Sequence, residues 1–465
     1  MLSETGEFPD TTDVLVLGAG MAGHCAALAA AEKGAQVLLL EKSSQPGGSS
    51  AIAGGAFVFC GTEEQKEAGQ EDDPDLLRRD LLNSGKQKNN TELVDLFVRK
   101  NLETYFFLRS YGVKFSLHML PPPAISRAHT TGTGRVITLL HMAAQAHPNI
   151  TYFSKSPALR LLRSDDGRVK GALVSYGDRE IEVTVRGGVV LATGGFSRSR
   201  ELLAIYAPEL VGAVKHGGVA NTGDGLIMAS DVGAGHADLG YVAGSFGGAI
   251  RNYPHVQAKS DEIPPLLFSF LEGGIMVNKH GHRFVDEAQN YKLLSGIGMA
   301  QPDGIGFQIF DKKLMDKSHE DTSVNNYREA MLAGYIQSSD TIEGLAGLMG
   351  IDPAALSETV ERYNTDVGKG CDSEFGRTGN LIALDSPPFY IAATANALTS
   401  TYGGLAADET MAVVDWYGVP IDGLYAAGEV VGGFHGAGYY SASSLSSSAT
   451  FGRQAGQSAA DAAIS

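Results

Sequence analysis

The stretch from Asp13 to Glu41 constrains the fold more than any other part of this chain. It begins with an apolar run of strand length, continues as Gly-Ala-Gly-Met-Ala-Gly over residues 18–23, and passes into an alanine-rich, helical segment. A second apolar run, residues 36–40, leads to the acidic residue Glu41. In a β-α-β unit such glycines permit a tight turn and bring backbone N–H groups close to a pyrophosphate. The stretch predicts a dinucleotide site rather than a glycine-rich turn of another α/β protein.

Composition narrows the class of protein. The chain has 465 residues, enough for two or three domains, and its formal net charge of −17 argues against nucleic-acid or anionic-membrane partners. No apolar stretch approaches the ~20 residues of a membrane span, and the acidic N-terminus lacks the apolar segment of a secretory signal. The three cysteines form no CxxC pair, so neither a metal site nor a disulfide framework is predicted. We expect a reducing, cytoplasmic location.

Residues 42–147 combine a small-residue loop with helical segments. Two glycine pairs flank a serine pair over residues 47–55, which favours a loop against a flat ligand over a flexible linker. Residues 72–109 have apolar positions at helical spacing and predict a helix. Arg127 and His129 follow a run of prolines, and we interpret them as part of a solvated loop rather than as residues facing a ligand.

The next segments are predicted to be mainly strands. Residues 150–153, 159–163, 169–175 and 180–186 are expected to form a β-meander. Gly188 to Phe196 again combines a strand with a glycine turn, which places it beside the first strand. Asp224 opens a helix, where it can act as a cap or touch the cofactor.

Residues 241–400 differ in character and predict an inserted cap, which divides the chain into 1–240, 241–400 and 401–465. The apolar stretch 263–270 would suit a greasy pocket or the cap core, and Asn278 to Gly281 predicts a hairpin turn. Helices are expected to begin at Asn325, Thr341 and Asp352.

The chain ends with a buried strand and glycine turn at 423–429, a serine run at 441–448 and a predicted helix over 449–463. The dipole of that helix would favour electron-rich ligand atoms at its N-terminus. A low-complexity serine linker is not expected between a strand and an amphipathic helix.

In this order, the motifs resemble the flavoprotein family of succinate dehydrogenase and fumarate reductase, which also contains the 3-ketosteroid dehydrogenases. The resemblance spans nearly the whole chain. It rests on Gly18-x-Gly20-x-x-Gly23 with Glu41, Gly47 to Gly55, Ala192 to Gly195, Thr222 to Gly225, and Leu424 to Glu429. It implies an α/β fold: a Rossmann-type, glutathione-reductase-like FAD-binding domain with an inserted α+β cap. The reaction that it implies is hydride transfer between flavin N5 and a substrate C–C bond.

FAD is expected to be non-covalent, because Ser49 and Ser50 stand where covalent members carry histidine. By the same resemblance, Glu41 holds the adenosine ribose, and Ser444 and Leu445 lie near the flavin ring edge. The residues expected to contact the cofactor are Gly18, Gly20, Ala22, Gly23, Glu41, Lys42, Gly48, Ser49, Ser50, Gly54, Gly55, Ala158, Ala192, Thr193, Gly194, Asp224, Gly428, Glu429, Ser444 and Leu445.

Departures from the family pattern fall on the groups that bind carboxylates. Fumarate-type members use arginines and histidines, which suit planar anions. Here Tyr291 and Tyr439 stand at two arginine places. Ser400-Thr-Tyr402 replaces a His-Thr segment, and Gly244-Ser-Phe246 replaces His-Pro-Thr. A dicarboxylate substrate is therefore not expected.

Tyrosines at these places resemble the ketosteroid branch, and most closely the Δ4-(5α)-dehydrogenases. The resemblance implies that Tyr291 is the base and that Tyr439, with Ser441, hydrogen-bonds a substrate carbonyl. The register leaves open whether Tyr439 or Tyr440 faces the substrate. Each tyrosine could instead be a buried aromatic residue with a satisfied hydroxyl.

Three functions remain open. The leading one is an FAD-dependent desaturase, or in reverse an ene-reductase, acting on a bulky uncharged cyclic ketone or enone. The second reduces a conjugated acid, with Arg127, Arg251 or Lys292 handling the charge. The third is a flavin redox carrier without a small substrate. No second nucleotide motif for NAD(P)H is visible, so an external electron acceptor or donor is expected.

Overall fold

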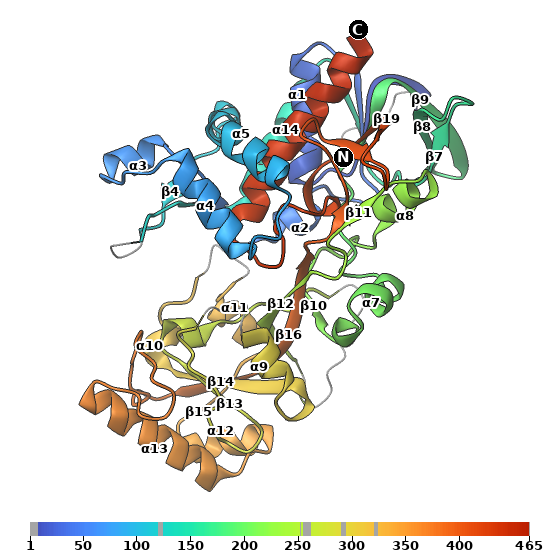
Figure 1. Cartoon of the computed structure of the whole chain (residues 1–465). Coiled ribbons are helices and arrows are strands. Elements are labelled where there is room, and N and C mark those ends of the chain that lie inside the picture. The colour runs from blue at the N-terminus through green and yellow to red at the C-terminus, as the bar shows by residue number, and fades with distance from the viewer. Residues whose placement is uncertain are drawn as a thin grey trace. The chain divides into compact units, whose positions relative to one another are not determined.

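The computed structural model describes residues 8–119, 124–251, 253, 262–289, 294–319 and 324–464. The chain forms two compact units (Figure 1). The first contains residues 1–207, 220–242 and 400–465, and the second contains residues 208–219 and 243–399. The predicted cap, 241–400, does not include the segment 208–219 that belongs to the second unit. The assignment of roles to these parts stays a prediction.

The first unit is built on a large sheet with the strand order β18-β19-β9-β1-β2-β6, to which β8 and β7 add beside β9. Strands β19, β9, β1, β2 and β6 run parallel to one another, whereas β18 pairs antiparallel with β19 at the edge. The predicted β-α-β unit is confirmed. The strands are β1 Thr11–Leu17, β2 Val37–Leu40, β6 Ile150–Phe153, β7 Ala158–Arg163, β8 Val169–Tyr176, β9 Arg179–Leu191, β18 Ala412–Val414 and β19 Pro420–Ala426.

Helices α1 (Met21–Glu32) and α14 (Ser443–Ile464) lie side by side in this unit (Figure 1). Every side chain from Met21 to Ala31 is buried, and most of them are small. Cβ atoms added at Gly452 and Gly456 of α14 would come within 2.3 and 2.1 Å of α1 carbonyl oxygens. Glycines at the contact therefore let the two helices touch backbone to backbone.

Smaller elements complete the first unit. A short sheet pairs β3 Ala56–Val58, β5 Ala128–Thr130 and β4 Ser116–Leu117, and β11 His236–Ala237 pairs with β17 Gly404–Leu405. The remaining helices are α2 Gly48–Ala51, α3 Glu63–Glu67, α4 Pro74–Ser84, α5 Thr91–Ser110, α6 Thr133–Ala146, α7 Arg200–Tyr206 and α8 Asp224–Asp231.

Part of the predicted β-meander is wrong. β7, β8 and β9 do form consecutive antiparallel pairs, but β6 pairs in parallel with β2 in the main sheet. β9 also continues without interruption from the meander into the row beside β1. The first part of this long strand lies in the antiparallel meander and is largely exposed or half-buried. Its last five residues lie in the parallel row and are all buried.

Two predicted helices have different bounds. The predicted helix 72–109 is two helices, because Gly85 ends α4 and the Asn90 side chain caps α5. The serine run lies mostly inside α14 rather than before it. Its hydroxyls bond carbonyls of the preceding turn, as Ser446 does with Ser443 at 3.1 Å, so serine is tolerated there.

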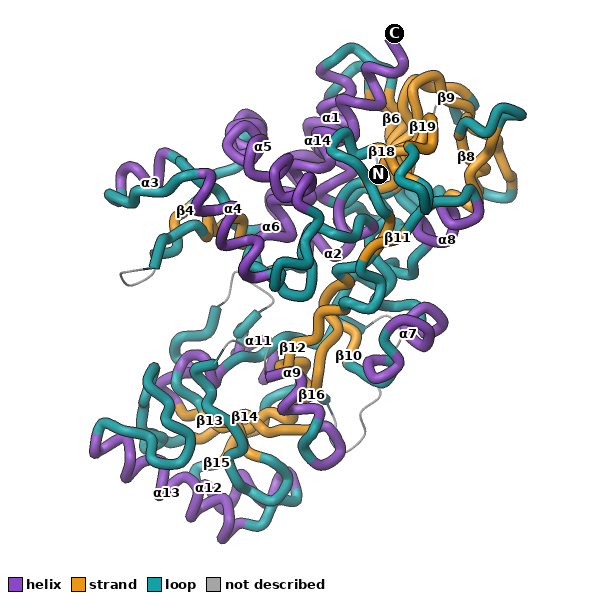
Figure 2. Tube along the Cα trace, in the orientation of Figure 1, coloured by secondary structure: helices purple, strands orange, loops and turns teal. Residues whose placement is uncertain are grey.

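The second unit packs helices on a sheet whose main row is β10-β16-β14-β13, with β12 and β15 also paired to β16. Figure 2 shows the strands of this unit with α12 and α13 beside them. The elements are β10 Val214–Lys215, β12 Val242–Ala249, β13 Ile275–Val277, α9 Leu294–Met299, β14 Ile305–Asp311, α10 Lys312–Met315, α11 Tyr327–Leu332, β15 Gln337–Ser339, α12 Ile342–Met349, α13 Pro353–Lys369 and β16 Phe389–Thr401.

The apolar stretch 263–270 belongs to the core of this unit. Leu266, Phe268 and Phe270 are buried in one apolar cluster, and Leu267 in another. The predicted turn at Asn278 is present, since Gly281 N–H donates to the Asn278 carbonyl at 3.0 Å. Its flanks meet only at a single bridge, however, because β13 pairs with β14 instead.

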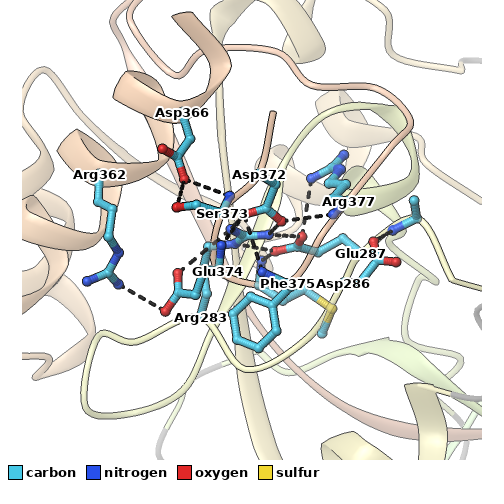
Figure 3. Close-up of polar contacts among 12 residues, drawn as sticks. Arg283, Asp286, Glu287, Arg362, Asp366, Asp372, Ser373, Glu374, Phe375 and Arg377 are labelled. Atoms are coloured by element: carbon cyan, nitrogen blue, oxygen red, sulfur yellow. Dashed lines mark hydrogen bonds and ion pairs between the residues drawn. The ribbon is translucent and has the colours of Figure 1, made fainter. Parts of the chain in front are cut away.

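A buried ion cluster ties this unit together (Figure 3). Arg283 donates to Glu287 through Nε and Nη2, and to Asp372 through Nη1 and Nη2. Arg377 also reaches Glu287, at 3.4 Å. These side chains are no more than 1% exposed. Burial alone would raise the pKa of Asp372, but hydrogen bonds from Arg283 and from the backbone lower it to about 2. Two cations and two carboxylates therefore compensate one another inside the unit.

None of the helices in the described ranges is both long enough and apolar enough to cross a bilayer.

Candidate cofactor and active site

Parallel strands of the large sheet end together. Register neighbours across β2, β1, β9 and β19 are Leu40, Leu17, Leu191 and Ala426. Ligands of open α/β sheets bind outside the carboxyl ends of such strands. The residues that follow immediately, or two positions later for the last strand, are the predicted cofactor residues Glu41, Gly18, Ala192 and Gly428. The structure therefore brings four distant motifs to one sheet edge.

The glycine turn is braced by the loop that follows β2. Gly47 N–H donates to the Ala19 carbonyl at 2.8 Å, and Met21 N–H donates to Ser50 Oγ at 3.2 Å. Gly20 is the N-cap of α1 and has no side chain to cap the helix, so Ser50 binds one first-turn N–H group from the neighbouring loop. The first turn of α1 thus keeps N–H groups toward the strand-end row, with the predicted serine pair of α2 beside it.

Glu41 is buried at the end of β2. Its carboxylate accepts N–H groups from Ala19 at 3.0 Å and from Ser43 at 2.8 Å. The Glu41 carbonyl accepts the N–H of Ser156 at 2.9 Å, which brings the start of β7, with Ala158, to the same place. The predicted contact of this carboxylate with a ribose stays a prediction.

Lys42 links two predicted cofactor motifs. Its ammonium group lies 2.7 Å from Asp224 and 2.6 Å from the Thr222 hydroxyl. The alternative in which Asp224 caps α8 is wrong, because Gly223 is the N-cap and no side-chain cap bond forms. The Asp224 carboxylate is instead held by Lys42 and Thr222 at the start of this helix.

Glu429 lies after β19, in a buried polar network. Its carboxylate accepts the Thr401 N–H at 2.9 Å and the Asn221 amide at 3.0 Å. Burial raises the pKa of Glu429 above its ordinary value, and these hydrogen bonds oppose the rise. Thr193 lies two residues after β9, and its buried hydroxyl has no hydrogen-bond partner within the described ranges.

These observations fit a dinucleotide cofactor. A buried hydroxyl without a protein partner calls for a ligand or a water. Around Gly48 there is open space, since an added Cβ would meet nothing within 4 Å. The start of α1, where the N-cap Gly20 has no side chain, can offer N–H donors to a phosphate group. Gly54 and Gly55 lie between α2 and β3, where the Gly55 carbonyl accepts the Thr131 N–H at 2.9 Å. Ser444 and Leu445 lie in the first turn of α14.

Tyr439 belongs to a cluster of three rings. Its ring is stacked on Tyr402 at 5.7 Å with 10° between the planes, and both rings contact His435, at 5.3 and 5.0 Å. We call Tyr402, His435 and Tyr439 the ring cluster. Burial raises the pKa of Tyr439, and hydrogen bonds from the Ser444 hydroxyl and from N–H groups of Ser444 and Ala442 oppose that rise. Its phenol therefore stays protonated at neutral pH, as a hydrogen-bond donor must. Ser441 is exposed in the turn before α14.

Tyr440 has different surroundings. Its hydroxyl accepts a hydrogen bond from Arg127 at 3.0 Å. Arg127 also forms a two-pronged pair with Asp72 and reaches Asp80 at 2.6 Å. Burial alone would lower the pKa of Arg127, but these partners raise it.

The interpretation of residues 127–129 as a solvated loop is wrong. Arg127 is only 3% exposed, and His129, on β5, is fully buried with its ring 2.7 Å from the Thr62 hydroxyl. Two aspartates compensate the charge of Arg127, which makes its burial possible. Another cation considered for an anionic substrate, Arg251, is paired with Glu262. The predicted base Tyr291, and Lys292, lie outside the described residues.

Sequence reasoning did not assign roles to Tyr402, His435, Asn221 or Thr401. Tyr402 and Thr401 gave a signal, as parts of the departing segment Ser400-Thr-Tyr402. Asn221 carries no pattern that points to Glu429, which lies 208 positions away, and His435 is recognised only from its ring contacts.

Comparison with known proteins settles the family. The model of the FAD binding domain family matches residues 13–445. The chain belongs to this FAD-binding family. It is 32% identical over 468 residues to the probable fumarate reductase Ifc3 of Shewanella frigidimarina, covering 98% of this chain and 76% of that protein.

Two solved structures extend the family comparison. The open conformation of a flavocytochrome c3 fumarate reductase has a TM-score of 0.85 and 31% identity, covering 98% of this chain and 79% of that one. The 3-ketosteroid-Δ4-(5α)-dehydrogenase of Rhodococcus jostii RHA1, in complex with 4-androstene-3,17-dione, has a TM-score of 0.74 and 26% identity, covering 98% of both chains. The predicted family, fold class and cofactor are confirmed. The protein is an FAD-dependent oxidoreductase acting on CH–CH groups.

Proposed function

We propose that this enzyme transfers hydride between flavin N5 and the C–C bond α,β to the ketone of a bulky, uncharged cyclic substrate, in either direction. The observation that carries the proposal is the ring cluster at Tyr439. A protonated phenol and stacked rings stand there. The family resemblance implies that fumarate-type members carry an arginine at this place. Such a surface suits a neutral carbonyl and not a carboxylate.

The ion pairs of Arg127 and Arg251, two candidates for binding an anionic substrate, support the same neutral substrate class. Arg127 is paired with Asp72 and Asp80, and Arg251 is paired with Glu262. An arginine already bound to a carboxylate must give up that partner to clamp a substrate carboxylate, and in a buried site this is costly. Of the three candidates for binding an anion, Arg127 and Arg251 are therefore engaged with carboxylates of the protein.

The chemistry divides into three roles. When bound, FAD accepts or supplies the hydride at the β-carbon. Tyr439, with Ser441, donates a hydrogen bond to the carbonyl oxygen, which strengthens as negative charge develops there. Tyr291 takes the α-proton in the dehydrogenation and returns it in the reverse reaction. We assign the substrate-binding role to the predicted cap.

A second candidate is reduction of a conjugated acid. The 32% identity to a probable fumarate reductase favours it. It requires a cation at the substrate carboxylate, and among the residues considered Lys292 remains for that role. A flavin redox carrier without a small substrate is the third candidate.

A substrate screen separates these candidates. The oxidised enzyme is mixed anaerobically with ketosteroids and other saturated cyclic ketones, and the dithionite-reduced enzyme with enoates and aromatic enones. We expect a saturated ketone to bleach the flavin. Reoxidation by an enoate alone would favour the second candidate, and no response to either class would favour the third.

The role of Tyr439 is tested by Tyr439→Phe. We expect the variant to bind FAD normally and to lose on the order of 10²-fold or more in kcat, because the oxyanion donor is gone. The matched control is Tyr417→Phe, whose ring is 91% exposed. Near-normal turnover of Tyr439→Phe on the true substrate would remove Tyr439 from the reaction.

We also infer that FAD is held without a covalent bond, as Ser49 and Ser50 suggest. Acid precipitation is expected to release all the flavin into the supernatant. Yellow colour retained in the protein pellet would contradict this inference.

A further inference from the structure

Tyr402 has no role in the proposed reaction as described so far, yet two hydrogen bonds hold the backbone at this residue and just before it. The preceding N–H, of Thr401, donates to Glu429 at 2.9 Å, and the N–H of Tyr402 itself donates to the Tyr241 carbonyl at 2.8 Å. The residue is only 7% exposed. A buried side chain whose backbone is held at two points keeps one position relative to its neighbours.

What it contacts is Tyr439. The two ring planes are 10° apart with centroids 5.7 Å from one another, an offset-stacked arrangement in the favourable range for aromatic pairs. The two residues come from different segments that follow different strands. Stacking is therefore a contact that fixes the plane of the Tyr439 ring from outside its own loop.

The loop that carries Tyr439 is anchored elsewhere. The Asn89 side chain donates to the Phe434 carbonyl at 2.7 Å, and Asn90 N–H donates to the Gly433 carbonyl at 2.7 Å. The buried ring of Phe434 then contacts His435 at 4.9 Å. The anchored Phe434 thus holds His435, which in turn contacts both other rings of the ring cluster.

We propose that Tyr402 is a positioning residue for the Tyr439 phenol, which it orients by ring stacking, with His435 as the second support. This inference rests on the proposed function of Tyr439 as the carbonyl donor. Tyr439 is half-buried, and the stacked ring covers part of its surface. The titratable groups in ring contact with Tyr439, within the described ranges, are Tyr402 and His435. The neighbouring Tyr440 hydroxyl is directed to Arg127.

The first test needs no substrate. Ultraviolet titration of phenolate in the holoenzyme, taken as the difference from the same protein carrying Tyr439→Phe, reports the ionisation of Tyr439 alone. Tyr402→Leu removes the stacked ring and admits water, so Tyr439 should ionise at lower pH than in the wild type. Tyr402→Phe keeps the ring and should leave the titration unchanged.

The second test measures turnover of the ketone that bleaches the flavin in the screen. We expect Tyr402→Leu to lower kcat on the order of tenfold or more, because a misplaced donor is costly, and to move the alkaline limb of the kcat profile to lower pH. Tyr402→Phe should stay within about threefold of the wild type, with KM little changed in both. Tyr417→Leu, at an exposed ring, is the matched control and should change nothing.

Outcomes separate this inference from the proposed function. If Tyr402→Leu alters neither titration nor turnover, or if it loses FAD and so proves merely structural, the positioning role is overturned. If Tyr439→Phe keeps full activity while Tyr402→Leu still shifts the titration, the proposed function fails and the contact between the rings stands.

Discussion

Gly20 and Gly23 lie three residues apart in the same turn but meet different neighbours. A Cβ added at Gly23 would lie 1.7 Å from the Gly18 carbonyl oxygen, so this position is closed by the protein itself. At Gly20 the nearest atom would be Ser50 Oγ at 3.5 Å, an ordinary contact. Backbone packing explains why residue 23 is a glycine. Protein contacts do not explain why residue 20 is one, whereas a bound ligand does.

The pair yields a matched prediction. Gly23→Ala is expected to destabilise the first unit by about 3 kcal/mol or more, since overpacking against backbone cannot relax. Gly20→Ala is expected to keep the stability of the apoprotein but to weaken FAD binding on the order of tenfold, because a methyl group would intrude on the pyrophosphate. Thermal unfolding of apoprotein and FAD titration measure the two effects. Equal loss of apoprotein stability in both variants would contradict the distinction.

His24 is fully buried in α1 behind this turn. Its Nδ1 lies 2.9 Å from the Gly20 carbonyl, and its Nε2 lies 3.1 Å from Nδ1 of His141. Burial lowers the pKa of His24 from 6.5 to about 4, against the opposing hydrogen bond to Gly20. The unfolded chain therefore takes up a proton near pH 6.5, whereas the folded chain does so only near pH 4.

This shift makes stability depend on pH. Between pH 6.5 and 4 the unfolded state binds more protons, so the contribution of His24 is fully present above pH 6.5 and falls by about 3 kcal/mol as the pH approaches 4. His24→Gln should have a shallower loss of stability over this range than the wild type. Urea unfolding at several pH values measures both slopes, and parallel slopes would refute the assignment. Comparing the two proteins cancels the contribution of His129 but not that of His141, which contacts His24.

At the scale of elements, the ion cluster around Arg283 joins the segment after β13 to the segment after α13 (Figure 3). Glu287 is fully buried between Arg283 and Arg377, whereas Glu374 is 28% exposed and lies 3.8 Å from Arg283. The same substitution at these two glutamates therefore compares the stability lost with a buried ion pair and the stability lost with an exposed one.

We expect Glu287→Gln to lower the stability of the second unit by about 3 kcal/mol or more, because it leaves buried guanidinium charge uncompensated. Glu374→Gln is expected to cost less than about 1 kcal/mol, since solvent screens its pairs. Chemical unfolding followed by circular dichroism measures both. A loss from Glu374→Gln as large as that from Glu287→Gln would show that burial does not set the cost.

Local signals made several elements predictable. Asp352 caps α13 and Thr341 caps α12 through side-chain bonds to their own first turns, so the residues that decide these helix starts are adjacent in sequence. The strand ends and the glycine turn at Gly18 were readable for the same reason. A motif that needs only its own neighbours can be recognised before the fold is known.

Contacts between distant residues were not predictable. Its sequence position after a run of prolines favours a solvated loop for Arg127, whereas its partners Asp72 and Tyr440 lie 55 and 313 positions away. β6 was assigned to the meander because its pattern does not name its partner, β2. The stacking of Tyr402 on Tyr439 likewise exists only once two strand ends have been brought together.

For the whole molecule, the open question is where the electrons come from or go. The sequence contains one dinucleotide fingerprint, at Gly18 to Gly23, and it lies at the strand-end row assigned to FAD. A hydride donated by NADH requires a second nucleotide site beside the flavin, and the sequence carries no further motif of that type. We therefore propose an external donor or acceptor as the redox partner.

This proposal predicts the response of the flavin to different reductants. Under anaerobic conditions, NADH and NADPH at millimolar concentration should leave the flavin of the purified enzyme oxidised over minutes, whereas dithionite should bleach it at once. The dithionite-reduced enzyme should then be reoxidised by the unsaturated form of the substrate, because hydride transfer at N5 runs in either direction. Stopped-flow absorbance at the flavin band follows each step. Rapid bleaching by either nicotinamide would place the donor site on this chain, and a search for basic residues facing the flavin would then replace the search for a partner.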